Sequence, residues 1–377
     1  MLYSAANDGM TEGPTWGAWW TQNSYGTAMA GFTLMDGFTF HAWRESQAWF
    51  FAHMANGSEA FPAAEGGGWA PDGAGCDDAS PLTCRHKQGD GNPKIHDWAL
   101  EETLSSVVMQ AELLLTSRNR TAIREFLPYF LRVSNLLESR RDPATGMTLF
   151  LSGVASNLLA PSFGAWKLDN GRAAWSYLTG ISVTYSAALD RVIELHRLVS
   201  SSAVDMFAQR RELTLRGLEE LWDPSGRFLI RSLDPNGTRH GVLGQPRHSY
   251  FDVWPNQDAI AWRVVNDSQA QKIWDVMDGP SLGKKLRPNT FMLPNYPSYD
   301  DMPCGSDVTC GQGLWKFGEW VNGGVWTTAE ARMIVAYCRL GLPELAAASL
   351  RQMISQFAST WRMDNPLTDF GATPRKK

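Results

Sequence analysis

The sequence lacks the features that nucleic-acid-binding and membrane-spanning proteins require. Its 377 residues carry 34 Lys and Arg against 39 Asp and Glu, a net charge of -5, so no basic excess can neutralise phosphates. No apolar run approaches the roughly 18–20 residues that cross a bilayer. A phosphate-binding glycine loop, a Gly-x-Ser-x-Gly elbow and a His-Glu-x-x-His motif are also missing. We therefore expect no nucleic-acid partner, no membrane span, no cofactor and no metal.

Cysteine is scarce, and four of the five cysteines form two close pairs. Cys76 and Cys84 flank one short polar loop, and Cys304 and Cys310 flank another. Neither spacing fits a zinc knuckle, so we predict two small disulfides and hence an oxidising compartment. Cys338 lies in a long helical pattern and is predicted to be a buried free thiol.

Four Asn-x-Ser/Thr sequons agree with a secreted or lumenal glycoprotein. They begin at Asn56, Asn119, Asn236 and Asn266. No charged and apolar signal segment follows Met1, so we expect that the natural N-terminus lies upstream.

Helical periodicity dominates the chain, and the helices come in pairs. The predicted pairs are 25–35 with 38–54, 96–116 with 122–141, 174–199 with 203–222, 256–265 with 268–277, and 327–340 with 343–362. Long loops rich in Gly, Pro and aromatic residues separate them, at 56–95, 142–173, 226–255 and 279–323. Residues 228–230 in the third of these loops are predicted as a short strand.

Tight turns that alternate with long loops predict a single all-α domain over residues 1–377, an (α/α)6 toroid. The short turns would close one rim and the long loops would build the other. Five hairpins are visible where an ideal toroid has six, so either the toroid is incomplete or the chain is truncated at one or both ends. Binding and catalytic residues gather on loops that a rigid scaffold positions, and we expect them on the long-loop rim.

Tryptophan is abundant, at 17 residues, and indole faces pack well against sugar rings. Large helical cores also use Trp, so this interpretation stays open for any single residue. Polar and aromatic residues gather in four loop segments, where we predict contacts with a carbohydrate substrate. The predicted contacts are Trp16, Trp19, Trp20, Gln22 and Asn23, then His96, Asp97 and Trp98, then His248, Tyr250, Asp252 and Asn256, and finally Trp320, Asn322 and Trp326. The first segment alternatively packs on the helices, and Asp97 alternatively caps one.

Glycoside hydrolysis needs one protonated and one charged carboxyl group across the scissile bond. The candidates at loops or loop edges are Asp169, Asp252, Asp258, Glu319 and Glu330. Glu319 lies between aromatic residues, where desolvation raises a carboxyl pKa toward that of a general acid. Asp258 alternatively complements a helix N-terminus, and Glu330 alternatively forms a structural pair.

Three segments resemble the six-hairpin glycosidase superfamily. Residues 320–326, followed by an amphipathic helix and Arg339-Leu340-Gly341, are similar to a late barrel segment of that group. Residues 19–25 resemble the opening loop of trehalase-like and glucosidase-like members, and 115–142 resemble their second hairpin. The resemblance implies an (α/α)6 barrel and a glycosidase, with the general acid near Asp169 and the second carboxyl close to the end of the barrel.

Together these features predict a glycoside hydrolase that acts on an oligo- or polysaccharide with inversion. Asp169 would be the acid and Asp258 or Glu319 the base, with carboxyl groups roughly 6.5–9.5 Å apart. The segments around Trp19, Trp98, Tyr250 and Trp326 are expected to converge on one rim.

Two alternatives stay open. Arg247, His248 and Tyr250 would suit a polysaccharide lyase, in which a His or Tyr abstracts a proton from a uronate beside a neutralising Arg. An incomplete toroid would also suit an inactive carbohydrate-binding relative. The sequence leaves the oligomeric state open.

Overall fold

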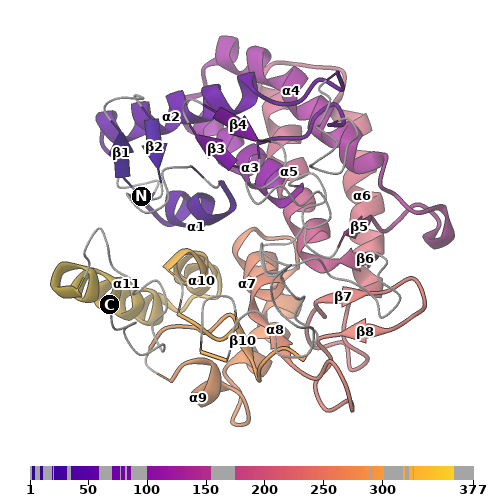
Figure 1. The fold of residues 1–377 in the computed structure, drawn as a ribbon, viewed down its shortest axis with the longest axis vertical. Helices are drawn as coiled ribbons and strands as arrows, with labels where there is room; N and C mark the ends of the chain where they lie inside the picture. Colours follow the sequence, from indigo (N-terminus) through magenta and orange to yellow (C-terminus); the bar gives the residue numbers. More distant parts are fainter. Residues whose placement is uncertain are drawn as a thin grey trace.

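The computed structural model describes residues 2–4, 9–11, 19, 21–31, 35–58, 70–76, 78–80, 83–85, 100–153, 175–288, 290–300, 317–318, 322–325 and 327–360. Within these residues, five pairs of helices follow one another round a ring (Figure 1). The pairs are α1 (Thr21–Gly31) with α2 (Gly37–Ala52), α3 (Leu100–Ser117) with α4 (Arg120–Glu138), α5 (Thr179–Leu198) with α6 (Val204–Glu220), α7 (Val253–Ala261) with α8 (Asp267–Met277), and α10 (Thr327–Arg339) with α11 (Pro343–Thr360). None of these helices is long and apolar enough to cross a membrane.

The first helix of each pair lines the inside of the ring. Helix α1 packs on α3, α3 on α5, α5 on α7, α7 on α10, and α10 on α1, so the ring closes. Every residue of α7 is buried, because an inner helix has neighbours on all sides. The outer helix α4 instead buries one apolar stripe and exposes the rest. The predicted all-α toroid of helical hairpins is confirmed.

The two rims of the ring differ as the sequence predicts. Short turns join the helices within each pair, whereas long connections join one pair to the next. All five inner helices therefore run in the same direction and begin on the long-loop rim. Since a helix N-terminus carries partial positive charge, this rim receives the positive ends of five helix dipoles.

Short strands and helical turns lie in the long connections. The four-stranded antiparallel sheet has the order β5 (Leu151–Gly153), β6 (Trp175–Leu178), β7 (Ser232–Leu233) and β8 (Arg239–His240). The two-stranded sheets pair β1 (Leu2–Ser4) with β2 (Gly9–Thr11), β3 (Asp78–Ser80) with β4 (Thr83–Arg85), and β9 (Phe251–Asp252) with β10 (Asn295–Tyr296). The 3-10 turn η3 (Pro143–Thr145) and the short helix α9 (Gly283–Leu286) complete the connections.

Two local predictions from the sequence are wrong. Residues 175–178, assigned to a helix, form strand β6 because β5 and β7 pair with them on both sides. Residues 228–230, assigned to a strand, contribute only a single bridge at Leu229. The amide of Phe228 donates to the Asp223 carboxylate and that of Leu229 to the Asn256 side chain, so side chains replace a strand ladder.

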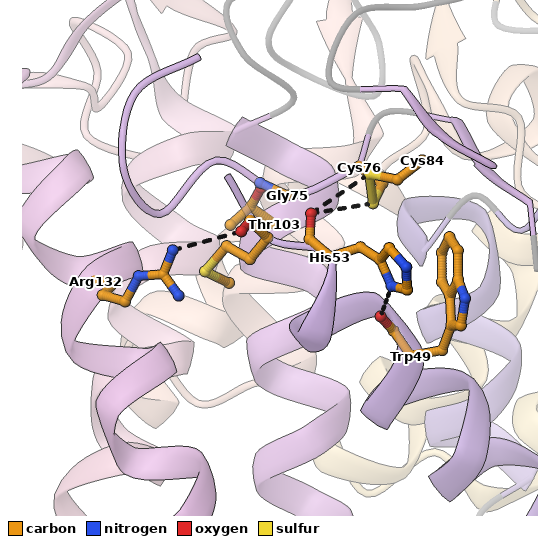
Figure 2. Close-up of a disulfide and its surroundings, with 8 residues drawn as sticks. Trp49, His53, Gly75, Cys76, Cys84, Thr103 and Arg132 are labelled. Carbon is orange, nitrogen blue, oxygen red and sulfur yellow. Dashed lines mark hydrogen bonds between the residues drawn. A yellow bond between two sulfur atoms is a disulfide. The ribbon is translucent and has the colours of Figure 1, made fainter. Parts of the chain in front are cut away.

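The predicted Cys76–Cys84 disulfide is present, with 5.3 Å between the two Cα atoms (Figure 2). The bond ties the segment before β3 to strand β4. Nearby, the Arg132 guanidinium of α4 donates to the carbonyl of Ala55 at 2.5 Å and pairs with Asp72 at 2.7 Å, so the loop is fastened to the outer helix.

The other cysteine predictions have different outcomes. Cys304 and Cys310 lie outside the described residues. Cys338 is a free thiol, as predicted, but it is exposed rather than buried. It lies on α10 directly after the buried residues Ala336 and Tyr337.

Candidate functional site

Some of the predicted site residues lie outside the part of the chain that the structure describes. These are Asp169, Glu319, Trp16, Trp20, His96, Asp97, Trp98, Trp320 and Trp326. Gln22 and Asn23 lie in the first turn of α1, where only their backbone is described. The others are Trp19, His248, Tyr250, Asp252, Asn256, Asp258, Asn322 and Glu330. Most of these residues precede the inner helices α1, α7 and α10 or lie in their first turn, so they share the long-loop rim, whereas Asp258, the sixth of the nine residues of α7, lies deeper in the ring.

Asp258 joins three inner helices in the interior of the ring. Its Oδ2 atom accepts a hydrogen bond from the Tyr25 hydroxyl of α1 at 2.5 Å. The same oxygen lies 3.0 Å from a guanidinium nitrogen of Arg332 on α10. The Arg332 guanidinium also lies over two rings, 3.9 Å from the centroid of Tyr25 and 4.7 Å from that of Trp254. One carboxylate, one phenol and one sandwiched cation therefore form a buried polar cluster.

The electrostatics of this cluster are dominated by burial. Desolvation raises the pKa of Asp258, while the Arg332 charge and the Tyr25 hydrogen bond act in the opposite direction. Desolvation also raises the pKa of Tyr25 well above its ordinary value, so the phenol stays a donor. The second carboxylate oxygen of Asp258 is buried without a hydrogen-bond partner among the described residues. That oxygen is the part of the cluster that remains able to accept a hydrogen bond.

Gln257, the neighbour of Asp258 on α7, is fully buried. Neither its amide oxygen nor its amide nitrogen has a hydrogen-bond partner in the described part of the chain. Buried polar groups are nearly always satisfied, so this amide, like the second oxygen of Asp258, remains able to form a hydrogen bond.

Glu330 holds together the loop before α10 and the helices α10 and α11. One carboxylate oxygen accepts the amide of Met292 at 2.7 Å, and the other is bonded to the Ser349 hydroxyl. The residue is fully buried, and desolvation raises its pKa to about 7 against these two hydrogen bonds. Because both oxygens are occupied, the geometry favours the structural interpretation of Glu330.

Asn322 and Asp252 belong to a hydrogen-bonded junction at the start of α7 and α10. The Asn295 amide donates to the Asn322 side chain at 3.1 Å and accepts from the amide of Gly323 at 2.7 Å. Asn295 pairs with Asp252 across β9 and β10. Asp252 in turn caps α7 by accepting from the amide of Trp254. This junction fixes where both inner helices begin.

Three further predicted contacts are buried and engaged in packing. Trp19, 2% exposed, lies edge-on against Trp43 of α2 with 5.7 Å between ring centroids. Tyr250, fully buried, packs edge-on against Tyr299 at 4.8 Å. Asn256 bonds to both the amide and the carbonyl of Leu229 at 2.8 Å. Trp19 therefore follows the packing alternative considered for its segment.

His248 is held by an acidic partner and a second histidine. Its Nδ1 atom lies 3.2 Å from Asp300, whose other oxygen accepts the His248 amide at 2.7 Å. Its ring stacks on that of His240 with 4.2 Å between centroids, and His240 Nε2 lies 2.9 Å from Asp234. Among the described residues, no three His, Cys, Asp or Glu side chains are placed to hold a metal ion.

Tyr25 and Arg332 are members of the cluster that the sequence did not predict. A signal was present in Arg332, since an arginine on the buried stripe of an amphipathic helix needs a carboxylate partner. The partner itself could not be named, because Asp258 lies 74 positions from Arg332 and 233 from Tyr25.

Several solved structures that share this fold are glycoside hydrolases. No protein-family model matches the sequence, and no curated protein sequence is similar to it. The family 63 mannosylglycerate hydrolase from Thermus thermophilus is similar with a TM-score of 0.62 and 13% identity, over 95% of this chain and 90% of that one. The family 78 rhamnosidase of Bacillus sp. GL1 is similar with a TM-score of 0.54 and 13% identity, over 90% of this chain and 27% of that one.

A rhamnosidase from Klebsiella oxytoca with rhamnose bound is also similar, with a TM-score of 0.54 and 13% identity, over 92% of this chain and 52% of that one. At such low identity the likeness concerns the fold. These neighbours belong to the six-hairpin glycosidase superfamily, so the resemblance drawn from the sequence is confirmed as a likeness of fold: the chain has the helical toroid of that superfamily.

Proposed function

We propose that this chain is a glycoside hydrolase that cleaves an oligo- or polysaccharide by carboxyl-pair catalysis with inversion. The observation that carries the proposal is the shared toroid, in which Asp258 of the inner helix α7 is buried with one carboxylate oxygen that has no hydrogen-bond partner among the described residues. In glycosidases of this chemistry one carboxyl protonates the leaving oxygen and the other activates a water. Asp169 is the proposed acid, and Glu319 or Asp258 the proposed base.

Asp258 and Glu319 are the two candidates for the catalytic base. Asp258 is paired with Arg332, which favours the charged form that a base requires, whereas burial opposes it. Glu319 lies in sequence between Gly318 and Trp320. Variants separate the two assignments: the true base, replaced by its amide, should lose turnover by several orders of magnitude while sugar binding persists.

The test is a screen of neutral and uronate-containing oligosaccharides, followed by variants on any substrate found. Asp169→Asn and one of Glu319→Gln or Asp258→Asn should abolish turnover, and Glu330→Gln should retain it because both oxygens of Glu330 serve packing. Proton NMR of the first product should show an inverted anomeric configuration. A retained configuration would contradict inversion, and an unsaturated product that absorbs in the ultraviolet would support a lyase instead. Binding without any turnover would support a carbohydrate-binding relative.

We also propose that the chain is secreted or lumenal and carries N-linked glycans. The Cys76–Cys84 disulfide and the exposed sequons support this proposal. At Asn119 the side-chain oxygen caps α4 by accepting the amides of Thr121 and Ala122 at 3.1 and 3.2 Å. A glycan is attached to the nitrogen of the Asn amide, so glycosylation and capping are compatible.

This arrangement provides a matched pair of variants. Thr121→Ala keeps the Asn119 cap but removes the sequon, and Asn119→Asp keeps a capping oxygen but removes the acceptor nitrogen. After expression in a glycosylating secretory host, both variants should lose the same glycan mass, while the Asn236 peptide should keep its own. An unmodified Asn119 peptide in the wild type would count against glycosylation at this site.

A further inference from the structure

Trp175 differs from the other tryptophans that the structure describes. It is 42% exposed, whereas tryptophans such as Trp19, Trp43 and Trp254 are buried. Burial of an indole stabilises a core, so a partly exposed one contributes less to folding than the buried tryptophans do. An exposed, flat aromatic surface on a rim of loops instead suits the apolar face of a sugar ring.

Trp175 stands on a rigid support. It is the first residue of β6, an inner strand of the four-stranded sheet with β5 on one side and β7 on the other. The Ser176 hydroxyl donates to the carbonyl of Leu233 at 2.9 Å, and the Tyr177 hydroxyl donates to Asp142 at 2.5 Å. These bonds fix the strand that carries the indole.

One face of the indole is already occupied. The Arg140 guanidinium lies over the Trp175 ring, 5.7 Å from its centroid. Because the side chain of Trp175 is 42% exposed, part of its ring stays accessible to a ligand beside that guanidinium.

The position of Trp175 relates it to the proposed catalytic segment. Residues 154–174 connect β5 to β6, and Asp169 lies in this connection, six positions before Trp175. Six residues span at most ~20 Å, a distance of a few sugar units. Strand β6 leads directly into the inner helix α5 on the long-loop rim. A glycan bound near Asp169 can thus extend over the indole.

We propose that Trp175 forms a sugar-stacking subsite, remote from the scissile bond, that binds one pyranose ring of a longer glycan. Arg140 is a positioning residue whose guanidinium lies over the indole ring. The inference rests on the proposed function, in that the ligand is a glycan that enters over the long-loop rim.

The test measures binding first and hydrolysis separately. Wild type and Trp175→Ala are titrated with oligosaccharides of increasing length, and binding is followed by calorimetry. Trp175→Ala should weaken binding of the longer glycans about tenfold and leave the shortest ones unchanged. Trp175→Tyr, which keeps a flat ring, should bind the longer glycans nearly as well as the wild type. Arg140→Met should weaken their binding less than Trp175→Ala does. If the glycan is cleaved, the same changes should appear in KM and not in kcat.

A matched control is available on the other rim. Phe38, at the start of α2 beside the short turn from α1, is 56% exposed, so Phe38→Ala removes an exposed aromatic ring from the opposite rim. This variant should bind glycans like the wild type. Equal binding by Trp175→Ala at every length, or no glycan binding by the wild type, would overturn the subsite. Length-dependent loss of binding without any cleavage would support the subsite and refute the hydrolase.

Discussion

Glu330 and His196 are buried titratable groups whose surroundings disfavour charge. For Glu330, burial raises the pKa from 4.5 to about 7, so the folded state keeps a proton that the unfolded state releases. His196 is the opposite case, because burial near Phe207 lowers its pKa and the unfolded state binds the extra proton. The two residues therefore make opposite contributions to the pH dependence of stability.

Replacing Glu330 by Gln should remove a loss of stability that the wild type suffers as pH rises. Between pH 4.5 and 7 the unfolded state ionises first, so the free energy of unfolding falls with pH and stays low above 7. The variant should therefore match the wild type near pH 4 and exceed it by up to about 3 kcal/mol at pH 8. Urea denaturation at a series of pH values measures this. The control Glu212→Gln changes an exposed residue of α6, so its free energy of unfolding should fall with pH as in the wild type. If Glu330→Gln shows the same fall, Glu330 is not its cause.

Replacing His196 by Phe should have its effect at acid pH. Neither ring nitrogen of His196 has a hydrogen-bond partner among the described residues, so the charged form is unsupported in the folded state. Stability of the wild type is complete above the unfolded pKa of about 6.5 and falls as pH drops below it. The advantage of the variant over the wild type should consequently be larger at pH 5 than at pH 7.5. A difference that is constant with pH would show that His196 does not titrate in this way.

At the scale of elements, the glycine that lets two inner helices touch is Gly26. A Cβ atom at this position of α1 would lie 2.6 Å from the Thr328 carbonyl and 2.8 Å from Cγ of Arg332 on α10. Gly26→Ala should therefore destabilise the fold by about 1–3 kcal/mol, since a packed core resists extra volume. At Gly31 of the same helix, no atom of the described residues lies within 4 Å of such a Cβ, so Gly31→Ala should be neutral or stabilising. Thermal unfolding of both variants compares the two sites, and equal Tm values would refute the close approach.

The sequence predicts the elements better than their contacts. The helical pairs follow from apolar residues spaced three and four apart, a local signal that survives in one sequence. Strand β6 was missed because its four residues run into the pattern of α5 and are recognisable only by their partners Leu151 and Leu233.

Contacts within the site depend on positions far apart in the chain. Asp258 was identified as a candidate from its place near a helix start, but its pairing with Tyr25 and Arg332 depends on how the ring closes. The same holds for His248, whose carboxylate partner Asp300 lies 52 positions away. Periodicity reports which face of a helix is buried, and it does not report which buried groups meet.

At the scale of the whole molecule, the ring closes where α10 meets α1 and α7. The cluster of Tyr25, Asp258 and Arg332 contributes one side chain from each of these helices. Buried ion pairs are costly to break on one side, because the remaining charge keeps its desolvation penalty without a partner. The cluster should therefore determine whether the first and last pairs of helices stay joined.

Arg332→Met should accordingly destabilise the protein by about 3–5 kcal/mol, because it leaves Asp258 buried without its cation. The double variant Arg332→Met/Asp258→Asn should recover part of this loss, since the amide carries no charge to desolvate. Amide hydrogen exchange locates the effect: protection in α1 should fall more than in α6, which packs on α5 and contributes no side chain to the cluster. A uniform loss of protection round the ring, or a double variant as unstable as the sum of the single ones, would show that this cluster does not hold the closure.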